Sequence, residues 1–235
     1  MKRNIYLISI TIVTISCIIL GSMYHGMGIV RTITRNIISE ADDEDTTSID
    51  NNNIDAFTRI TIDTDVANLN ISTGSSYSCR ITSVKKYPVT YTNENGELRI
   101  TQSSHNVVSS GWGNFTCRID ITVPADAQIE RTDIKSDVGN IDVGGCNIKD
   151  IIVETNVGNI DLSNNTFTNL TVSSDIGNID ISGVKDVDNY NVDINTDLGK
   201  VKYCGSTSKG SMNRTVASPI GYIKIESDVG NISLN

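Results

Sequence analysis

An eight-residue motif recurs along the second half of the chain and constrains the fold more than any other feature. Its clearest copies read Ser-Asp-Val-Gly-Asn-Ile-Asp-Val at 136–143, Thr-Asn-Val-Gly-Asn-Ile-Asp-Leu at 155–162 and Ser-Asp-Ile-Gly-Asn-Ile-Asp-Ile at 174–181, so their glycines are 19 residues apart. Two more copies follow, and a degenerate copy at 64–71 carries Ala67 in place of the glycine. A fixed period of this length is typical of solenoids and other repeat architectures.

Apolar residues flank each glycine at fixed positions: five and one residues before it, and two and four residues after it. Within each flank the apolar spacing is two, the period of a strand with one buried face. Across the glycine the spacing becomes three, and a glycine permits this break because it tolerates φ > 0. We therefore predict a corner at each glycine and four buried aliphatic residues per copy. The predicted corner glycines are Gly139, Gly158, Gly177, Gly199 and Gly230.

One copy alone cannot bury its apolar face, whereas stacked copies bury it against each other. Helical repeats are excluded because the apolar period is two and Val-Gly-Asn would interrupt each helix. The prediction is an all-β, single-chain β-solenoid with repeats of 19 to 22 residues. Regular repeats are expected over 131–235 and a less regular β region of the same solenoid over 56–130, with a hairpin turn at 93–96. The last copy ends at Asn235, which predicts an open solenoid edge there.

The N-terminal residues have a different character. Lys2 and Arg3 precede an uncharged, mostly apolar stretch over 5–24, which is long enough to cross a bilayer as one helix. A cleavable signal peptide is the alternative, although its apolar core would be shorter. We expect a cytoplasmic tail over 1–4, a single-pass transmembrane anchor over 5–24 and an extracytoplasmic β domain, because positive charge stays inside. An acidic polar linker over 25–55 would hold that domain away from the membrane.

The order of these segments resembles a known family. An alternating strand that ends in Val123-Pro124 is followed by the Ser-Asp-Val-Gly-Asn-Ile-Asp-Val copies, as in the bacterial "putative adhesin" domain of unknown function, which includes LiaG-like membrane-anchored envelope-stress proteins. The likeness covers about residues 56–235, with departures at Ala67 and in the longer spacing before Gly199. It implies a membrane-anchored β-solenoid without catalytic residues. Surface binding or adhesion is the implied function, and envelope-stress sensing through membrane signalling partners is the alternative.

Asp142, Asp161 and Asp180 each lie three residues after a glycine. They follow inward isoleucines and so face outward, and stacking would place them about 4.8 Å apart. Like charges in such a row are unfavourable unless they are well solvated or bridged by a cation. The row is therefore either a solvated acidic face or a site for divalent cations or cationic peptides. Asn140, Asn159, Asn178 and Asn231, which directly follow four of the glycines, are expected to form a hydrogen-bonded ladder.

Charge and motif content limit the partners and the chemistry. The net charge of −9 argues against nucleic acid, because phosphate binding needs a basic surface. The expected partners are the membrane, through the N-terminal helix, and an envelope protein, a glycan or a cationic peptide. The sequence carries no phosphate-binding glycine loop and no nucleophile elbow, so neither an enzyme nor a cofactor is predicted.

Cys79 and Cys117 share the local sequence Cys-Arg-Ile, and strand alternation places both on the face of the following isoleucine. They are either buried free thiols that pack as small apolar residues or the two halves of a disulfide. Zinc is disfavoured because the chain has no Cys-x-x-Cys pair.

Overall fold

The computed structural model describes residues 46–84, 88–102 and 117–235, which belong to one compact unit, Asp45–Asn235. The predicted anchor over 5–24 and the linker up to residue 45 lie outside the described residues. No helix in the described part combines the length and the apolar character that a membrane span requires. That part is all β, apart from one short 3-10 turn, η2, at Val187–Asn189.

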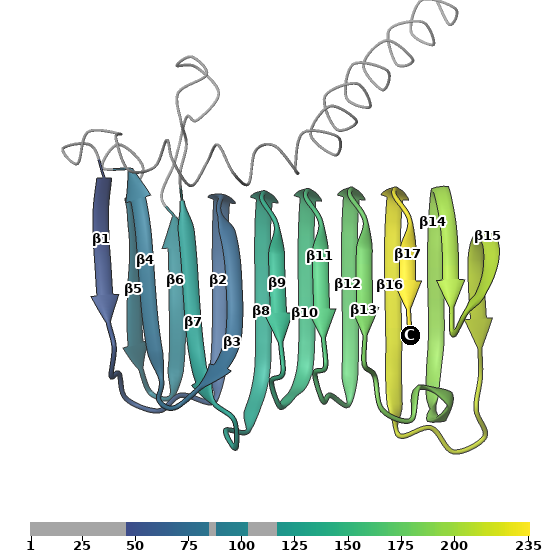
Figure 1. Ribbon diagram of the computed structural model, residues 1–235, viewed down its shortest axis with the longest axis horizontal. Helices are drawn as coiled ribbons and strands as arrows, with labels where there is room; N and C mark the ends of the chain where they lie inside the picture. The colour runs from purple at the N-terminus through teal and green to yellow at the C-terminus, as the bar shows by residue number, and fades with distance from the viewer. Residues whose placement is uncertain (1–45, 85–87, 103–116) are drawn as a thin grey trace, which may run out of the picture. The chain divides into compact units, whose positions relative to one another are not determined.

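The strands of the described residues join into one continuous, hydrogen-bonded sheet that winds into stacked coils (Figure 1). They are β1 (Thr46–Asn51), β2 (Arg59–Val66), β3 (Asn68–Gly74), β4 (Ser78–Val84), β5 (Val89–Glu94), β6 (Glu97–Gln102), β7 (Arg118–Pro124), β8 (Ile129–Val138), β9 (Ile141–Gly144), β10 (Ile148–Val157), β11 (Ile160–Ser163), β12 (Asn169–Ile176), β13 (Ile179–Ser182), β14 (Tyr190–Tyr203), β15 (Ser206–Arg214), β16 (Gly221–Val229) and β17 (Ile232–Leu234). The expected β-solenoid-like, all-β fold is therefore confirmed for this part of the chain.

The sheet forms two walls with the core between them. The first wall runs β5–β6–β2–β8–β10–β12–β16–β14, and the second runs β1–β4–β7–β3–β9–β11–β13–β17 and then the last residues of β14. Neighbouring repeat coils pair parallel and in register, so Ile134, Val153 and Val172 lie side by side. All three are buried. Each repeat thus covers the apolar side chains of its neighbour, which a single copy could not do.

The last coil of the chain does not lie at the end of the stack. β16 pairs with β12 on one side and with β14 on the other, and β17 lies in the same way between β13 and β14 (Figure 1). β14 is therefore outside the coil that follows it in sequence, and β15 covers β14 as an antiparallel strand. The prediction of an open edge at Asn235 is wrong, because its backbone N–H donates to the Ile181 carbonyl at 2.9 Å.

Close contact between the backbones of neighbouring coils requires the five corner glycines. A Cβ placed on Gly158 would lie 1.8 Å from the carbonyl oxygen of Gly139, and a contact of the same length recurs at the other four glycines. Positive φ is confined to three of the five: Gly139, Gly158 and Gly177, with values of 148°, 157° and 159°. Gly199 and Gly230 lack it. The glycines lie at the predicted corners, but backbone approach is the reason that all five share.

The apolar residue before each glycine does not belong to the core. Val138 is 44% exposed and Leu198 is 63% exposed, whereas the Ser or Thr three residues before the glycine is buried. The chain begins to turn before the glycine, so the strand alternation ends there. In the coil of Gly158 the buried aliphatic residues include Ile148 and Ile151 and exclude Val157. The repeat pattern therefore predicted wrongly that Val157 belongs to the core, and it missed Ile151.

Residues 46–51, which the sequence analysis placed in the linker, form β1. This strand pairs antiparallel with β4 along its whole length, and Ile49 packs against the core. The segment is polar, so its sequence gives little sign of a strand. Backbone hydrogen bonds to the edge of β4 order it.

Cys79 and Cys117 are buried free thiols. β4 and β7 are antiparallel with Cys79 opposite Ile121, which puts Cys117 four residues further along, about 13 Å away at strand spacing. A disulfide needs Cα atoms within about 7 Å, so the alternative of a Cys79–Cys117 disulfide is wrong and the expectation of buried free thiols is confirmed. Burial, with a smaller effect of Asp120, raises the pKa of Cys79 to about 12, and burial raises the pKa of Cys117 to about 11.

The glycine contact predicts a large difference between two neighbouring substitutions. Gly158→Val should lower the free energy of unfolding by about 3 kcal/mol or more, because the new side chain would overlap the Gly139 carbonyl. Asn159→Ser should cost about 1 kcal/mol, the value of one hydrogen bond. Urea denaturation of the purified chain measures both. Equal midpoints for the two variants would contradict the assigned corner geometry.

Candidate functional site

One row of outward positions crosses the second wall, and we call it the outer row. Its members face one another in register on successive strands: Asp50, Arg80, Asp120, Asn70, Asp142, Asp161, Asp180, Ser233, Lys202 and Thr207. The structure thus brings the three predicted aspartates together as consecutive, exposed members of this row. Neighbouring strands lie about 4.8 Å apart, so three carboxylates follow one another at that spacing.

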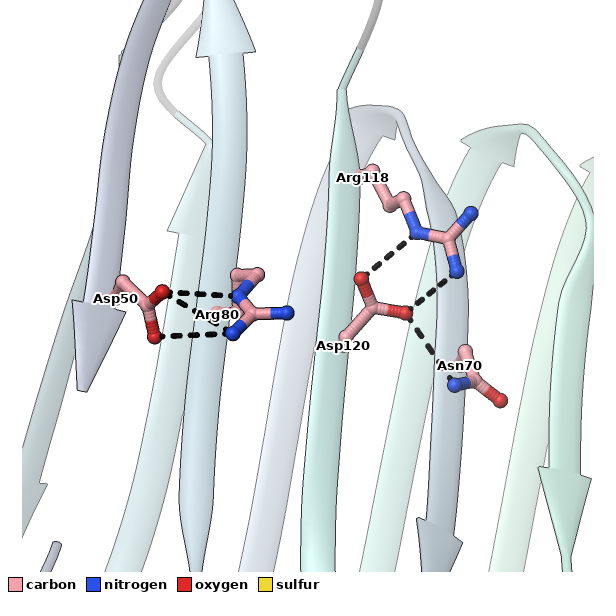
Figure 2. Close-up of polar contacts among 5 residues, drawn as sticks. All are labelled: Asp50, Asn70, Arg80, Arg118 and Asp120. Atoms are coloured by element: carbon pink, nitrogen blue, oxygen red, sulfur yellow. Dashed lines mark hydrogen bonds and ion pairs between the residues drawn. The ribbon is translucent and has the colours of Figure 1, made fainter. Parts of the chain in front are cut away.

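The carboxylates at the β1 end of the outer row are paired with arginines (Figure 2). Arg80 Nε donates to Asp50 Oδ2 at 3.1 Å, and Arg118 Nε donates to Asp120 Oδ2 at 2.7 Å. Asn70 Nδ2 also donates to Asp120, at 3.3 Å. Burial of Asp120 opposes ionisation, but the hydrogen bonds from Arg118 and Asn70 and the positive charges of Arg118 and Arg80 hold its pKa below the usual value. This end of the row is therefore electrostatically balanced.

Asp142, Asp161 and Asp180 differ from these paired residues. In the part of the chain that the structure describes, their carboxylates take part in no hydrogen bond or ion pair. Partial burial, followed by the charges of Asp180 and Asp142, raises the pKa of Asp161. Burial also raises the pKa of Asp142, against the opposing charge of Arg118. The middle of the outer row therefore carries mutually repelling charge.

The three carboxylates are poorly arranged to share a single metal ion. Among the described residues, no group of three or more His, Cys, Asp or Glu side chains could hold a metal ion. Side chains on one sheet face project side by side, one from each strand, whereas Ca²⁺ takes six to eight oxygens at about 2.3–2.6 Å. The row is better suited to a ligand with several separated positive charges than to a single divalent ion.

The asparagines after the glycines form the expected ladder beside this row, but through the backbone. The backbone N–H of Asn159 donates to Asn140 Oδ1 at 3.1 Å, that of Asn178 donates to Asn159 Oδ1 at 3.0 Å, and that of Asn231 donates to Asn178 Oδ1 at 3.0 Å. Lys200 N–H donates to Asn231 Oδ1 at 3.1 Å. These amide oxygens hold adjacent coils together and fix the register of the aspartates next to them.

The coil architecture and its repeated corner agree with the comparison to known families. The family model of the Toastrack DUF4097 domain matches residues 57–235. The chain belongs to the Toastrack DUF4097 family. The match covers the same part of the chain as the resemblance drawn from the sequence, and it confirms the assignment to an adhesin-like domain of unknown function.

The chain is also similar to solved structures, to different degrees. A protein from Clostridium sporogenes described as a "putative cell adhesion protein" is 18% identical with a TM-score of 0.56, and the alignment covers 80% of this chain and 96% of that one. A "putative adhesin" from Bacteroides fragilis is 14% identical with a TM-score of 0.37, over 81% of this chain and 97% of that one. None of the curated proteins matches the chain significantly. At these identities the likeness concerns the fold alone.

The repulsion within the outer row predicts that Asp161→Asn stabilises the Toastrack domain at neutral pH, by about 0.5 kcal/mol for an exposed group. The pKa of Asp161 in the folded chain lies above its ordinary value of 3.8, so the folded state binds the proton more tightly than the unfolded state. The free energy of unfolding therefore decreases as the pH rises from about 3.8 through the raised pKa of Asp161 in the folded chain. An Asn side chain does not ionise, so the Asp161→Asn variant avoids this decrease.

Urea denaturation at neutral pH and at acidic pH measures this effect. Asp126→Asn, in the turn after β7, is the matched control because it removes one exposed carboxylate outside the row. The prediction would be contradicted if the Asp161→Asn variant were less stable than the wild-type chain at neutral pH, or if the Asp126→Asn control gained as much stability.

Proposed function

We propose that this chain is a non-catalytic, membrane-anchored binding module, which presents its Toastrack domain outside the cell membrane and binds cationic ligands through the outer row. One observation carries the proposal. Asp142, Asp161 and Asp180 stand in register with no described partner, in a row whose carboxylates at the β1 end are paired with arginines.

The location outside the membrane is supported by the N-terminal sequence. Lys2 and Arg3 before the apolar stretch 5–24 favour a cytoplasmic start, and the acidic segment after it would act as a tether. The Clostridium sporogenes relative is described as a cell adhesion protein, and an extracytoplasmic position suits such a role.

The ligand chemistry follows from the electrostatics of the row. Three carboxylates at strand spacing produce a stronger local field than scattered surface charges, and the net charge of −9 adds a general attraction for cations. Salt screens this field over about 8 Å at physiological ionic strength. An extended peptide with several lysines or arginines can place its positive charges along the row, so we propose a basic peptide segment as the ligand.

Titration of the purified chain with a ten-residue lysine peptide tests this proposal. The chain should bind the peptide at low salt and more weakly at physiological salt. Replacing Asp142, Asp161 and Asp180 with Asn should weaken binding at low salt about tenfold, because three exposed ion pairs are lost. Calcium should show no comparable dependence on these residues.

The matched control replaces Asp137, Asp175 and Asp228 with Asn. These exposed residues lie two positions before the glycines, so the control removes the same charge near the same corners and leaves the outer row intact. Equal loss of peptide binding in the two triple variants would show that only net charge matters. Binding that no variant changes would also contradict the proposal.

Cys204 offers a test of the location. It is exposed at a turn after β14, whereas Cys79, Cys117 and Cys146 are buried. A membrane-impermeant maleimide added to intact cells should therefore label the chain at Cys204, and Cys204→Ser should abolish the labelling. Labelling that requires permeabilised cells would place the domain on the cytoplasmic side.

A further inference from the structure

A hollow of about 760 Å³ opens on the outer face of the first wall, over β6, β2, β8 and β10, which lie side by side in Figure 1. Four basic and four acidic side chains line it, together with Thr61. The lining is therefore neutral, although the chain carries a net charge of −9. This wall is distinct from the wall that holds the outer row.

Several of these charges are already satisfied within the wall. Arg99 Nη2 donates to Glu97 Oε1 at 2.7 Å, and Thr61 donates to the same oxygen at 2.6 Å. Arg131 donates from Nε and Nη2 to both oxygens of Asp133, at 2.7 and 2.8 Å. These pairs form the fixed frame of the hollow.

Arg59 and Glu130 are not held in this way. Their closest contact joins Arg59 Nη2 and Glu130 Oε2 at 3.7 Å, beyond hydrogen-bond distance, and the side chains are 61% and 63% exposed. Arg59 lies directly beside Arg131 on the neighbouring strand, and Arg131 lies beside Asp150. Arg59 and Arg131 are therefore neighbours across the sheet, with Glu97 and Asp150 at the same level on the two flanking strands.

This arrangement selects for a particular ligand charge. A purely anionic ligand would meet four carboxylates in the hollow, and a purely cationic ligand would meet four basic groups. A ligand that carries both a negative and a positive charge can pair with the basic groups and with the carboxylates. Guanidinium groups recognise phosphate and carboxylate oxygens. The exposed contact of Arg59 with Glu130 contributes little to stability, so a ligand can replace it at little cost.

We infer that this hollow binds a small zwitterionic group, whose phosphate or carboxylate is held by Arg59 and Arg131 and whose ammonium is held by Glu130. Such a group occurs both as a lipid headgroup and on soluble or polymer-borne molecules. The inference does not depend on the proposed function of the outer row, so the variant with Asn at 142, 161 and 180 should keep this binding.

Calorimetric or NMR titration of the purified full-length chain with phosphoethanolamine, inorganic phosphate and ethanolamine tests the inference. Phosphoethanolamine should bind with a dissociation constant on the order of 1 mM, more tightly than either fragment. Arg59→Gln should weaken phosphoethanolamine and phosphate about tenfold, because a charge-assisted hydrogen bond is lost. Glu130→Gln should weaken phosphoethanolamine and leave phosphate unchanged or tighter.

The control is Lys135→Gln, which removes an exposed positive charge from β8, the strand of Glu130 and Arg131, outside the hollow. Phosphate that binds as tightly as phosphoethanolamine, a Glu130→Gln variant that affects both ligands alike, or a wild-type chain that binds neither would each overturn the inference. Vesicles of phosphatidylethanolamine and of phosphatidylglycerol then separate the sources. Binding to the former assigns the group to lipid, and binding to free phosphoethanolamine alone assigns it to a soluble or polymer-borne ligand.

Discussion

The close approach of backbone to backbone at the corners determines most of the architecture. Each corner glycine faces a carbonyl oxygen of the adjacent coil at a distance that leaves no room for a Cβ. After every corner glycine except Gly199 an asparagine follows, and it accepts a hydrogen bond from the next coil at about 3 Å. Together these contacts fix both the separation and the register of the coils. A coil that slipped by one residue would lose the ladder and would turn its buried isoleucines to solvent.

Fixed register has a direct consequence for the surface. Each outward position of the repeat forms a column of side chains across the sheet. A charged residue type that recurs at one position therefore produces an extended strip of charge. The outer row changes from paired charges to bare carboxylates because Arg80 and Arg118 belong to the less regular half of the solenoid, whereas Asp142 and Asp161 belong to the repeats. On the first wall the same regularity places Arg59 beside Arg131.

The repeat predicted the coil, the corners and the alignment of the aspartates, because these depend on spacing within one copy. The local turn sequence Asn-Glu-Asn-Gly, which is separate from the repeat, predicted the hairpin at 93–96, where Asn95 and Gly96 both have positive φ between β5 and β6. Features that depend on contacts between distant segments were missed. The pairing of β1 with β4, the offset of Cys79 from Cys117 and the hollow around Arg59 all depend on which strands become neighbours. The period of the repeat carries no such information.

The order of the coils in space differs from their order in the chain. β16 and β17 follow β14 and β15 in the chain, yet they lie between the β12–β13 coil and β14. Until they emerge, the β14–β15 hairpin has no correct partner, and the growing stack ends in an exposed edge at β12 and β13. Assembly from the N-terminus therefore cannot finish coil by coil. A chain cut before Gly221 would lack β16 and β17, and it would be left with two unjoined pieces in place of a slightly shorter solenoid.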